Sequence, residues 1–425
     1  MEQWNNVELT SLRKKSYTLN HEYDLANKCV VAANNNSEST QKSATNGTDD
    51  NGADNANQSE LLQPGSNIKP KVTTENVEAL VRRLYGITIN EIKELISYDD
   101  RNYLIQPDWN IKNPIITTQW PHGYVLKILN ALDSKKTDFI DAQNQLMLYL
   151  SNEGIVCPRP ITNVNGKYFS VEHINGGDHV VRLLEFVPGK MFHEVEKSNY
   201  LLYKSGEYIA KIDRALKNFH HEAYDTHKTL WMLESVPQLR EFLYALTDHD
   251  RKALVEEIIE AFEKNVLTKV DKLEKQIIHG DFNEQNIIVE ESKTSSNGEY
   301  KVKAVIDFGD TNNSPVIFEI GIALTYMILQ AKSIESGGYF LAGYMDIRAI
   351  SNEERILLKY CVAARLAQSL VMGAYTHSLD PSNEYVLVTQ EEGWKMIEEL
   401  WRNRFAEIDE LWQTTADKYL TQSVK

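Results

Sequence analysis

Hydrophobic residues follow two different spacings along this chain, and the change between them falls near residue 188. Before it, apolar residues alternate with polar ones or form short continuous runs, as in GYVLKIL and HVVRLLEFVPG, which is typical of β-strands. After it, they recur three and four positions apart, as at Ile209, Ile212 and Leu216, which is typical of a buried helix face. The pattern predicts an α+β protein with a small β-rich lobe, residues 73–187, and a larger helical lobe, residues 188–425.

The first helical segment marks where folded sequence begins. Apolar residues between positions 77 and 84 are helically spaced, follow a polar residue at Thr74 and are ended by Gly86. Before them, residues 32–71 are mostly Asn, Ser, Thr, Asp and Gly. This composition buries too little apolar surface to offset the entropy lost on folding. Residues 1–72 are therefore predicted to form a disordered extension.

Three polar side chains stand beside the ends of predicted strands in the helical half. Asp281 and Asn286 belong to IIHGDFNEQNIIVE, and Asp307 belongs to AVIDFGD. Either motif alone is more often a turn, but both in this order, each on an apolar run, indicate the group that a kinase places around a nucleotide-bound metal. Asp281 is predicted to accept the proton of the attacking hydroxyl. Asn286 and Asp307 are predicted to supply the oxygen ligands of Mg²⁺.

A kinase also needs a strand lysine that holds the inner phosphates of the nucleotide. Lys127 stands in the middle of the alternating strand GYVLKIL. A solvent-facing strand lysine is the ordinary explanation, but the motifs downstream favour the cofactor role. Its ion-pair partner is predicted on the next helix, where Asp141 is the nearest carboxylate, although Gln143 is closer to the position where kinases usually place glutamate.

Two further segments are predicted to contact the nucleotide. The polar turn in ISYDDRNYLI lies where a kinase covers the phosphates, but it lacks glycine. Ser97, Asn102 and backbone N–H groups would therefore bind the phosphates, unless the segment is an ordinary Asp-rich hairpin turn. The strand in HVVRLLEFVPG leads into the link between the lobes. There the backbone groups of Glu185 and Val187 are predicted to bind the purine edge.

Composition limits where the protein acts and what it binds. The 425 residues carry a net charge of −16, which disfavours nucleic acid as a partner. The charge permits a cationic small substrate, and it also fits an acidic surface that serves solubility. Three scattered cysteines have no metal-ligand spacing, and no signal peptide or apolar run of about 20 residues is visible. We expect a soluble cytoplasmic protein that does not enter membranes, and no oligomeric state is predicted.

The motifs also resemble one branch of the kinase-like superfamily. Gly280 stands where protein kinases have arginine, and no lysine stands two residues after Asp281. In this the chain resembles the aminoglycoside phosphotransferases and choline kinases, which phosphorylate small molecules. From about Glu75 onward, several segments resemble the hydroxylysine kinase family: SYDDRNY, YVLKI, VRLLEFVPG, NFHH, HGDFNEQNI, VIDFGD and RLAQSLVMGAY. The resemblance implies a protein kinase-like two-lobed fold and transfer of the terminal phosphate of GTP, or of ATP, to the side-chain hydroxyl of 5-hydroxylysine, with Mg²⁺.

Four residues are predicted to contact the acceptor. Asp310 follows the second motif and is expected to orient the loop or to meet an ammonium group. Arg365 lies in an apolar helix, so its guanidinium requires a partner, either the carboxylate of the substrate or an internal carboxylate. Gln368 and Trp231 are lesser candidates, and Trp231 is as readily explained as a core residue.

Two other functions fit the same residues. One is a different kinase of this superfamily, acting on an amino alcohol, a homoserine-like substrate or an aminoglycoside. The other is a non-catalytic binding protein with a kinase-like fold. The second is disfavoured because Lys127, Asp281, Asn286 and Asp307 are all present, whereas a decayed site is expected to lack at least one.

Overall fold

The computed structural model describes residues 68–423, except residues 98, 109–110, 117–118, 294–297 and 380–388. The predicted disordered extension lies outside the described residues up to residue 67. Helix α2 (Thr74–Tyr85) begins where the sequence pattern predicted. Thr73 and Asn76 form a capping box at its start, and Gly86 ends it with a φ of 60°.

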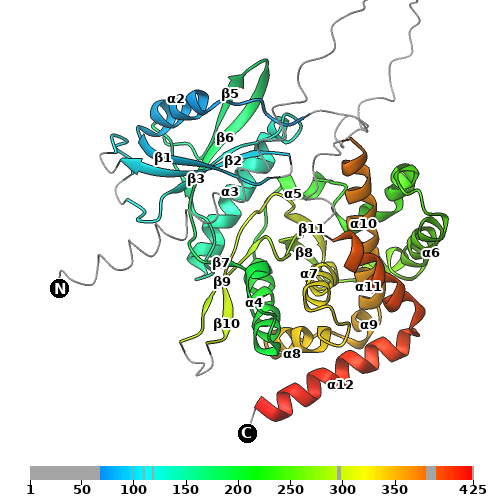
Figure 1. Ribbon diagram of the computed structural model, residues 1–425. Coiled ribbons are helices and arrows are strands. Elements are labelled where there is room, and N and C mark those ends of the chain that lie inside the picture. The colour runs from blue at the N-terminus through cyan, green and yellow to red at the C-terminus, as the bar shows by residue number, and fades with distance from the viewer. Residues whose placement is uncertain are drawn as a thin grey trace, which may run out of the picture. The chain divides into compact units, whose positions relative to one another are not determined.

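An antiparallel sheet forms the core of the first lobe (Figure 1). Its strands are β1 (Thr88–Leu95), β2 (Arg101–Asp108), β3 (Tyr124–Ile128), β4 (Pro160–Ile161), β5 (Ser170–Ile174) and β6 (Gly177–Glu185). They are ordered β1-β2-β3-β6-β4, and β5 also pairs with β6. The hairpin of β1 and β2 is the segment that the sequence placed over the nucleotide phosphates.

The two faces of this sheet pack against different helices. Leu126 and Ile128 of β3 lie in the same apolar cluster as residues of α2. Helix α3 (Thr137–Asn152) packs against the other face, where its Ile140 clusters with Val180. Because side chains alternate along a strand, Lys127 is directed toward the face that α3 covers. The alternation in the sequence thus places this lysine away from the apolar core of its lobe.

The second lobe is mainly helical, as predicted. Its helices are α4 (Asn199–Leu216), α5 (Ala223–Thr226), α6 (His249–Asn265), α7 (Val316–Ala331), α8 (Gly337–Ile347), α9 (Asn352–Arg355), α10 (Leu358–Leu379), α11 (Gln390–Arg402) and α12 (Phe405–Ser423). Every residue of α7 from Val316 to Leu329 is buried, so this helix forms the centre of the lobe. Helices α8 and α10 lie beside it, and α4 packs against α8 (Figure 1).

Short strands in the second lobe carry the predicted motifs. They are β7 (Lys190–Met191), β8 (Lys275–Ile278), β9 (Ile287–Glu291), β10 (Tyr300–Val305) and β11 (Asn312–Pro315). Strands β9 and β10 form the predicted hairpin, β7 pairs with β9, and β8 pairs with β11. The catalytic motif therefore connects β8 to β9, and the second motif connects β10 to β11. Together the two lobes confirm the predicted α+β, kinase-like architecture.

One apolar helical stretch within the described residues has the length and composition of a membrane span. It covers Asn352–Leu379 and reaches a mean hydropathy of 1.3, but 83% of its most apolar window is buried inside the protein. That degree of burial is typical of a helix in a protein core.

Candidate active site

The loop between β8 and β9 is fixed from behind by two contacts. The ring Nε2 of His279 lies 3.1 Å from the backbone oxygen of Ile306, and the N–H of Gly280 donates to Oε2 of Glu319 at 3.0 Å. Gly280 has a φ of 79°, and a Cβ there would lie 2.5 Å from the carbonyl oxygen of Asp310. Only glycine fits this position without strain. This explains why the arginine of protein kinases is replaced here.

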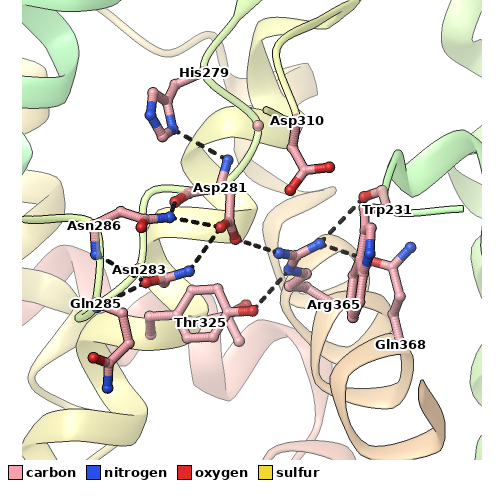
Figure 2. Close-up of polar contacts among 12 residues, drawn as sticks. Trp231, His279, Asp281, Asn283, Gln285, Asn286, Asp310, Thr325, Arg365 and Gln368 are labelled. Atoms are coloured by element: carbon pink, nitrogen blue, oxygen red, sulfur yellow. Dashed lines mark hydrogen bonds and ion pairs between the residues drawn. The ribbon is translucent and has the colours of Figure 1, made fainter. Parts of the chain in front are cut away.

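The carboxylate of Asp281 is held by three side-chain donors (Figure 2). Its Oδ2 accepts from the amides of Asn283 at 2.8 Å and Asn286 at 2.7 Å. Its Oδ1 accepts from Nη2 of Arg365 at 2.7 Å. The side chain of Asp281 remains 18% exposed, whereas that of Arg365 is only 2% exposed. The carboxylate is thus fixed in direction and still open on one side.

The structure brings the other two members of the predicted set to the same place. The N–H of Ile306 donates to the backbone oxygen of Asn286 at 2.8 Å, which joins the two motifs. Asp307 follows directly, with a φ of 59°, an uncommon conformation for a residue with a side chain and one that is found at functional sites. Its Oδ1 accepts from Lys127 Nζ at 3.1 Å and from the N–H of Gly309 at 3.2 Å.

The donor atoms of Asn286 and Asp307 fit a magnesium ion. The Nδ2 of Asn286 is used by the side chain and the backbone oxygen of Asp281, which leaves its amide oxygen as the ligand atom. The side chain of Asp307 is 43% exposed. Burial raises the pKa of Asp307, but the ammonium of Lys127, the charge of Arg182 and the N–H of Gly309 together leave this pKa below its ordinary value. One carboxylate and one amide oxygen suit Mg²⁺, which usually completes its shell with phosphates and water.

Other metal centres are held by groups of His, Cys, Asp or Glu side chains. Among the residues that the structure describes, no three His, Cys, Asp or Glu side chains form a group that could hold a metal ion. When bound, Mg²⁺ would neutralise charge that develops on the phosphates.

Lys127 has two carboxylate neighbours, and neither is the predicted one. Its Nζ lies 3.1 Å from Asp307 and 4.0 Å from Asp100. Asp141 instead accepts from Gln145, one helical turn away. The predicted ion pair with Asp141 is therefore wrong, because the carboxylate comes from the turn between β1 and β2 and not from α3. Asp100 is fixed there by the N–H and the amide of Asn130, at 2.9 and 3.2 Å.

Helix α3 reaches the second motif through an amide. Gln143, which occupies the approximate position of the kinase glutamate, donates to the carbonyl oxygen of Gly309 at 3.3 Å. Its Oε1 is buried and has no hydrogen-bond partner among the described residues. The helix thus supports the loop of Asp307 without a charge.

A row of polar residues crosses the sheet beside Lys127. In the strand register Lys127 is opposite Asn102 on β2 and Arg182 on β6, so the three share one face. Arg182 is 2% exposed, and its Nη1 donates to Oδ1 of Asn144 at a long distance of 3.4 Å. Arg182 was not among the predicted site residues, although a charge within an apolar strand is the same signal that identified Lys127.

The predicted phosphate-binding residues are placed differently from each other. Asn102 lies in the row beside Lys127, as that role requires. The hydroxyl of Ser97 donates to the carbonyl oxygen of Asp100 within the same turn. The carbonyl oxygen of Ser97 accepts from the ammonium of Lys69. Ser97 therefore has the contacts of an ordinary hairpin-turn residue, which was the alternative explanation.

The two residues that were predicted to bind the purine in the link between the lobes have different surroundings. The N–H of Glu185 is already used by the carbonyl oxygen of Arg159 at 2.9 Å, so that group is not available to a purine. Val187 is buried and clusters with Ile288 and Ala304. Its side chain therefore belongs to an apolar cluster with the β9–β10 hairpin, and binding of a purine by its backbone stays a prediction.

The predicted acceptor residues gather around Asp281. Asp310 points into the space beside Asp281 and Arg365 (Figure 2). Burial, and then the charge of Asp281, raise the pKa of Asp310 well above its ordinary value. Trp231 accepts from Arg365 through its backbone oxygen, and its ring lies 5.2 Å from the guanidinium carbon. Trp231 and Asp310 therefore both flank the guanidinium.

Gln368 has no polar atom left for a substrate. Its Oε1 accepts from Arg365 at 2.9 Å, and its Nε2 donates to the carbonyl oxygens of Leu230 and Met232. The side chain is fully buried. The predicted contact with the acceptor is therefore corrected to an indirect one, in which Gln368 supports Arg365.

Comparisons with known proteins identify the family of this chain. Residues 93–352 match the phosphotransferase enzyme family. The chain is 33% identical to hydroxylysine kinase of Mus musculus over 84% of this chain and 96% of that protein, and the same values hold for hydroxylysine kinase of Xenopus laevis. The chain belongs to the hydroxylysine kinase family of phosphotransferases. Like its family, it is an enzyme that transfers phosphate from a nucleotide to an alcohol group of a small molecule.

More distant proteins share parts of the sequence or the fold. Homoserine kinase of Methylobacillus glycogenes is 24% identical over 54% of this chain and 66% of its own length. An aminopropanol kinase superposes with a TM-score of 0.61 at 14% identity, over 80% of this chain and 99% of that one. The amicoumacin kinase hAmiN gives a TM-score of 0.56 at 17% identity, over 80% and 94%. These two structures establish the fold of this member of the phosphotransferase family.

Proposed function

We propose that this phosphotransferase transfers the terminal phosphate of GTP to the side-chain hydroxyl of 5-hydroxylysine, with Mg²⁺. The observation that carries the proposal is the similarity to hydroxylysine kinases, which spans 96% of the mouse protein. The set of Lys127, Asp281, Asn286 and Asp307 supports it, because Lys127 contacts Asp307 and Asn286 contacts Asp281, as a kinase site would need. GTP follows from the family resemblance alone.

In this reaction the residues mainly orient the reactants. The O–H bond of the acceptor breaks, and the proton passes to the carboxylate of Asp281. The hydroxyl oxygen forms a bond to the terminal phosphorus, and the bond from that phosphorus to its bridging oxygen breaks. The electron pair leaves with GDP. Asn286 and Asp307 would hold Mg²⁺, which would neutralise phosphate charge, and Lys127 would bind the inner phosphates.

The charges beside Asp281 favour a cationic acceptor. Hydroxylysine carries two ammonium groups and one carboxylate. The carboxylate of Asp310 makes no hydrogen bond or ion pair within the described ranges and points to the same space as Asp281 (Figure 2). An ammonium group there would stabilise the ionised form of Asp310, whose pKa burial has raised. The overall charge of −16 would also attract a cation.

A hydroxy amino acid such as homoserine is the second candidate acceptor. The supporting observation is the similarity to a homoserine kinase, which is weaker and shorter than the similarity to hydroxylysine kinases. Homoserine has one ammonium group fewer than hydroxylysine, so the unpaired Asp310 favours hydroxylysine.

The test is phosphate transfer by the full-length enzyme with Mg²⁺ and labelled GTP or ATP. The acceptors are hydroxylysine, lysine, homoserine and choline, and Asp281→Asn is the control for contaminating kinases. We expect labelled product from hydroxylysine with GTP and none from lysine, which lacks the hydroxyl. A higher kcat/KM with homoserine or choline would overturn the acceptor, and a higher kcat/KM with ATP would overturn the donor.

A further inference from the structure

Arg365 is buried at a point where it meets the reacting carboxylate. It lies on α10, 84 residues after Asp281, and is 2% exposed. Burial lowers the pKa of Arg365, but Tyr326, Asp281 and Asp310 raise it above its ordinary value, so the guanidinium stays charged. A buried charge that is costly to desolvate is retained where its direction matters.

The protein fixes the guanidinium on every side. Its Nε donates to the hydroxyl of Tyr326 at 3.0 Å. Its Nη1 donates to the carbonyl oxygen of Trp231 at 3.2 Å and to Oε1 of Gln368 at 2.9 Å. The rings of Trp231 and Tyr326 lie 5.2 and 5.5 Å from its central carbon, within the range of cation–π contacts. Gln368 is itself fixed by two backbone oxygens.

The hydrogen-bond count excludes one role and indicates another. Arginine has five N–H groups, and the bonds to Tyr326, Trp231, Gln368 and Asp281 use all but one of them. One remaining N–H cannot make the paired contact by which arginine usually recognises a carboxylate. Arg365 therefore cannot bind the acceptor's carboxylate through two parallel hydrogen bonds.

The same count distinguishes the two oxygens of Asp281. Oδ2 receives two donors, from Asn283 and Asn286, and Oδ1 receives one, from Arg365. A carboxylate oxygen accepts about two hydrogen bonds. Oδ1 therefore keeps the position that can receive the hydroxyl proton, on the side where Asp310 also lies (Figure 2).

We propose that Arg365 is a positioning residue: it presents Oδ1 of Asp281 to the acceptor hydroxyl and does not bind the acceptor's carboxylate. This inference rests on the proposed kinase function and assigns the oxygen that accepts the proton. The hydroxyl lies between Oδ1 and the terminal phosphorus. Tyr326, Trp231 and Gln368 act through Arg365, because they fix the direction of its guanidinium.

The test compares two acceptors in Arg365→Met, Arg365→Lys and Arg355→Met, and it uses Arg365→Ala for rescue by added guanidinium ion. The acceptors are hydroxylysine and its decarboxylated analogue, which keeps the hydroxyl and both amines. Arg365→Met removes the charge, and Arg365→Lys keeps it without the fork. Arg355→Met is the matched control, because Arg355 also forms an ion pair, 3.3 Å from Asp409, and no contact among the described residues joins it to the site.

Arg365→Met is expected to lower kcat about 100-fold for both acceptors, because a reacting group that is displaced by about 1 Å loses that much. KM for the nucleotide should stay within about twofold, since Arg365 does not contact the residues that bind it. Arg365→Lys should recover part of kcat, and Arg355→Met should leave kcat unchanged. Melting temperatures of all variants show whether they fold, and added guanidinium ion should restore activity to a folded Arg365→Ala variant.

A different result would overturn the inference. If Arg365→Met raises KM for hydroxylysine and leaves its kcat intact, and the decarboxylated analogue is unaffected, Arg365 binds the acceptor's carboxylate. If native enzyme phosphorylates another alcohol and not hydroxylysine, the proposed acceptor fails, and the same variants are compared on that alcohol. The inference on Arg365 then fails only if Arg365→Met and the native enzyme have the same kcat on that alcohol.

Discussion

The two sides of the reaction centre are built differently. On the acceptor side, both oxygens of Asp281 have donors, and Arg365 is bonded through Nε and both Nη atoms. On the nucleotide side, around Lys127, several buried polar atoms have no hydrogen-bond partner among the described residues. They are Asn102 Oδ1, Gln143 Oε1, Asn144 Nδ2 and Arg182 Nε.

The difference indicates which side depends on its ligand. A buried polar atom without a partner costs about 1–3 kcal/mol, so a phosphate, a metal ion or ordered water that bonds to the row of Asn102, Lys127 and Arg182 would be favoured. The acceptor side is oriented before any substrate arrives. Preorganisation of this kind serves a reaction in which the enzyme mainly aligns a hydroxyl with a phosphorus atom.

Glu284 is an exception on the acceptor side. It belongs to the same loop as Asp281, is 5% exposed, and its Oε2 has no partner within the described part of the chain. Burial raises the pKa of Glu284 to about 7, and the charge of Asp281 adds to this. A protonated carboxyl removes most of the cost of burial near a carboxylate.

The largest expected effect tests the acceptor side. Asp281→Asn should lower kcat by a factor on the order of 100 or more, because the amide cannot take up the hydroxyl proton. The nucleotide dissociation constant should change little. Single-turnover transfer from labelled GTP measures the first quantity, and displacement of a fluorescent nucleotide measures the second. Undiminished transfer in this variant would show that another group accepts the proton.

A smaller effect is expected on the nucleotide side. Lys127→Met should raise KM for the nucleotide roughly tenfold to a hundredfold, because it removes a charged hydrogen bond to the phosphates. KM for the acceptor should be unchanged. Lys93→Met is the matched control, since Lys93 is an exposed lysine on β1 of the same sheet. An equal change in the nucleotide KM of both variants would show that Lys127 does not bind the nucleotide.

Local sequence was sufficient for the parts of the site that lie on one strand or loop. Asp281, Asn286 and Asp307 were identified because each follows or precedes an apolar run, and the structure brings them together. Lys127 was identified from alternation within β3. The same reasoning predicted the lobes, because strand and helix spacings differ clearly on either side of residue 188.

Partners that come from distant segments could not be derived in this way. The sequence offered a helix carboxylate for Lys127, whereas the structure supplies Asp100 from a hairpin turn. For Arg365 the sequence left two possible partners, the carboxylate of the substrate or an internal carboxylate. Only the packing of α10 against the catalytic loop shows that Asp281 is the internal one. Spacing along one element does not determine which side chains meet across elements.

The smallest expected effect concerns carboxyls behind the acceptor side. Burial raises the pKa of Glu319, which bonds to Gly280, to about 8, and the charge of Asp213 adds to this. Burial also raises the pKa of Asp213 to about 7. Unfolded carboxyls titrate near pH 4. The native state therefore holds protons that the unfolded state has released between about pH 4 and pH 8, and the free energy of unfolding should fall as pH rises through this window.

Urea unfolding at about pH 6 and about pH 9 measures this slope. Asp213→Asn is the matched variant, because its amide oxygen can still accept the bond that the Tyr344 hydroxyl makes to Asp213 at 2.7 Å. The variant should lose part of the pH dependence and gain relative stability at the higher pH. A native protein that becomes more stable between these two values would show that both carboxyls are ionised in the fold. The carboxyls behind the catalytic loop would then be ionised and not neutral.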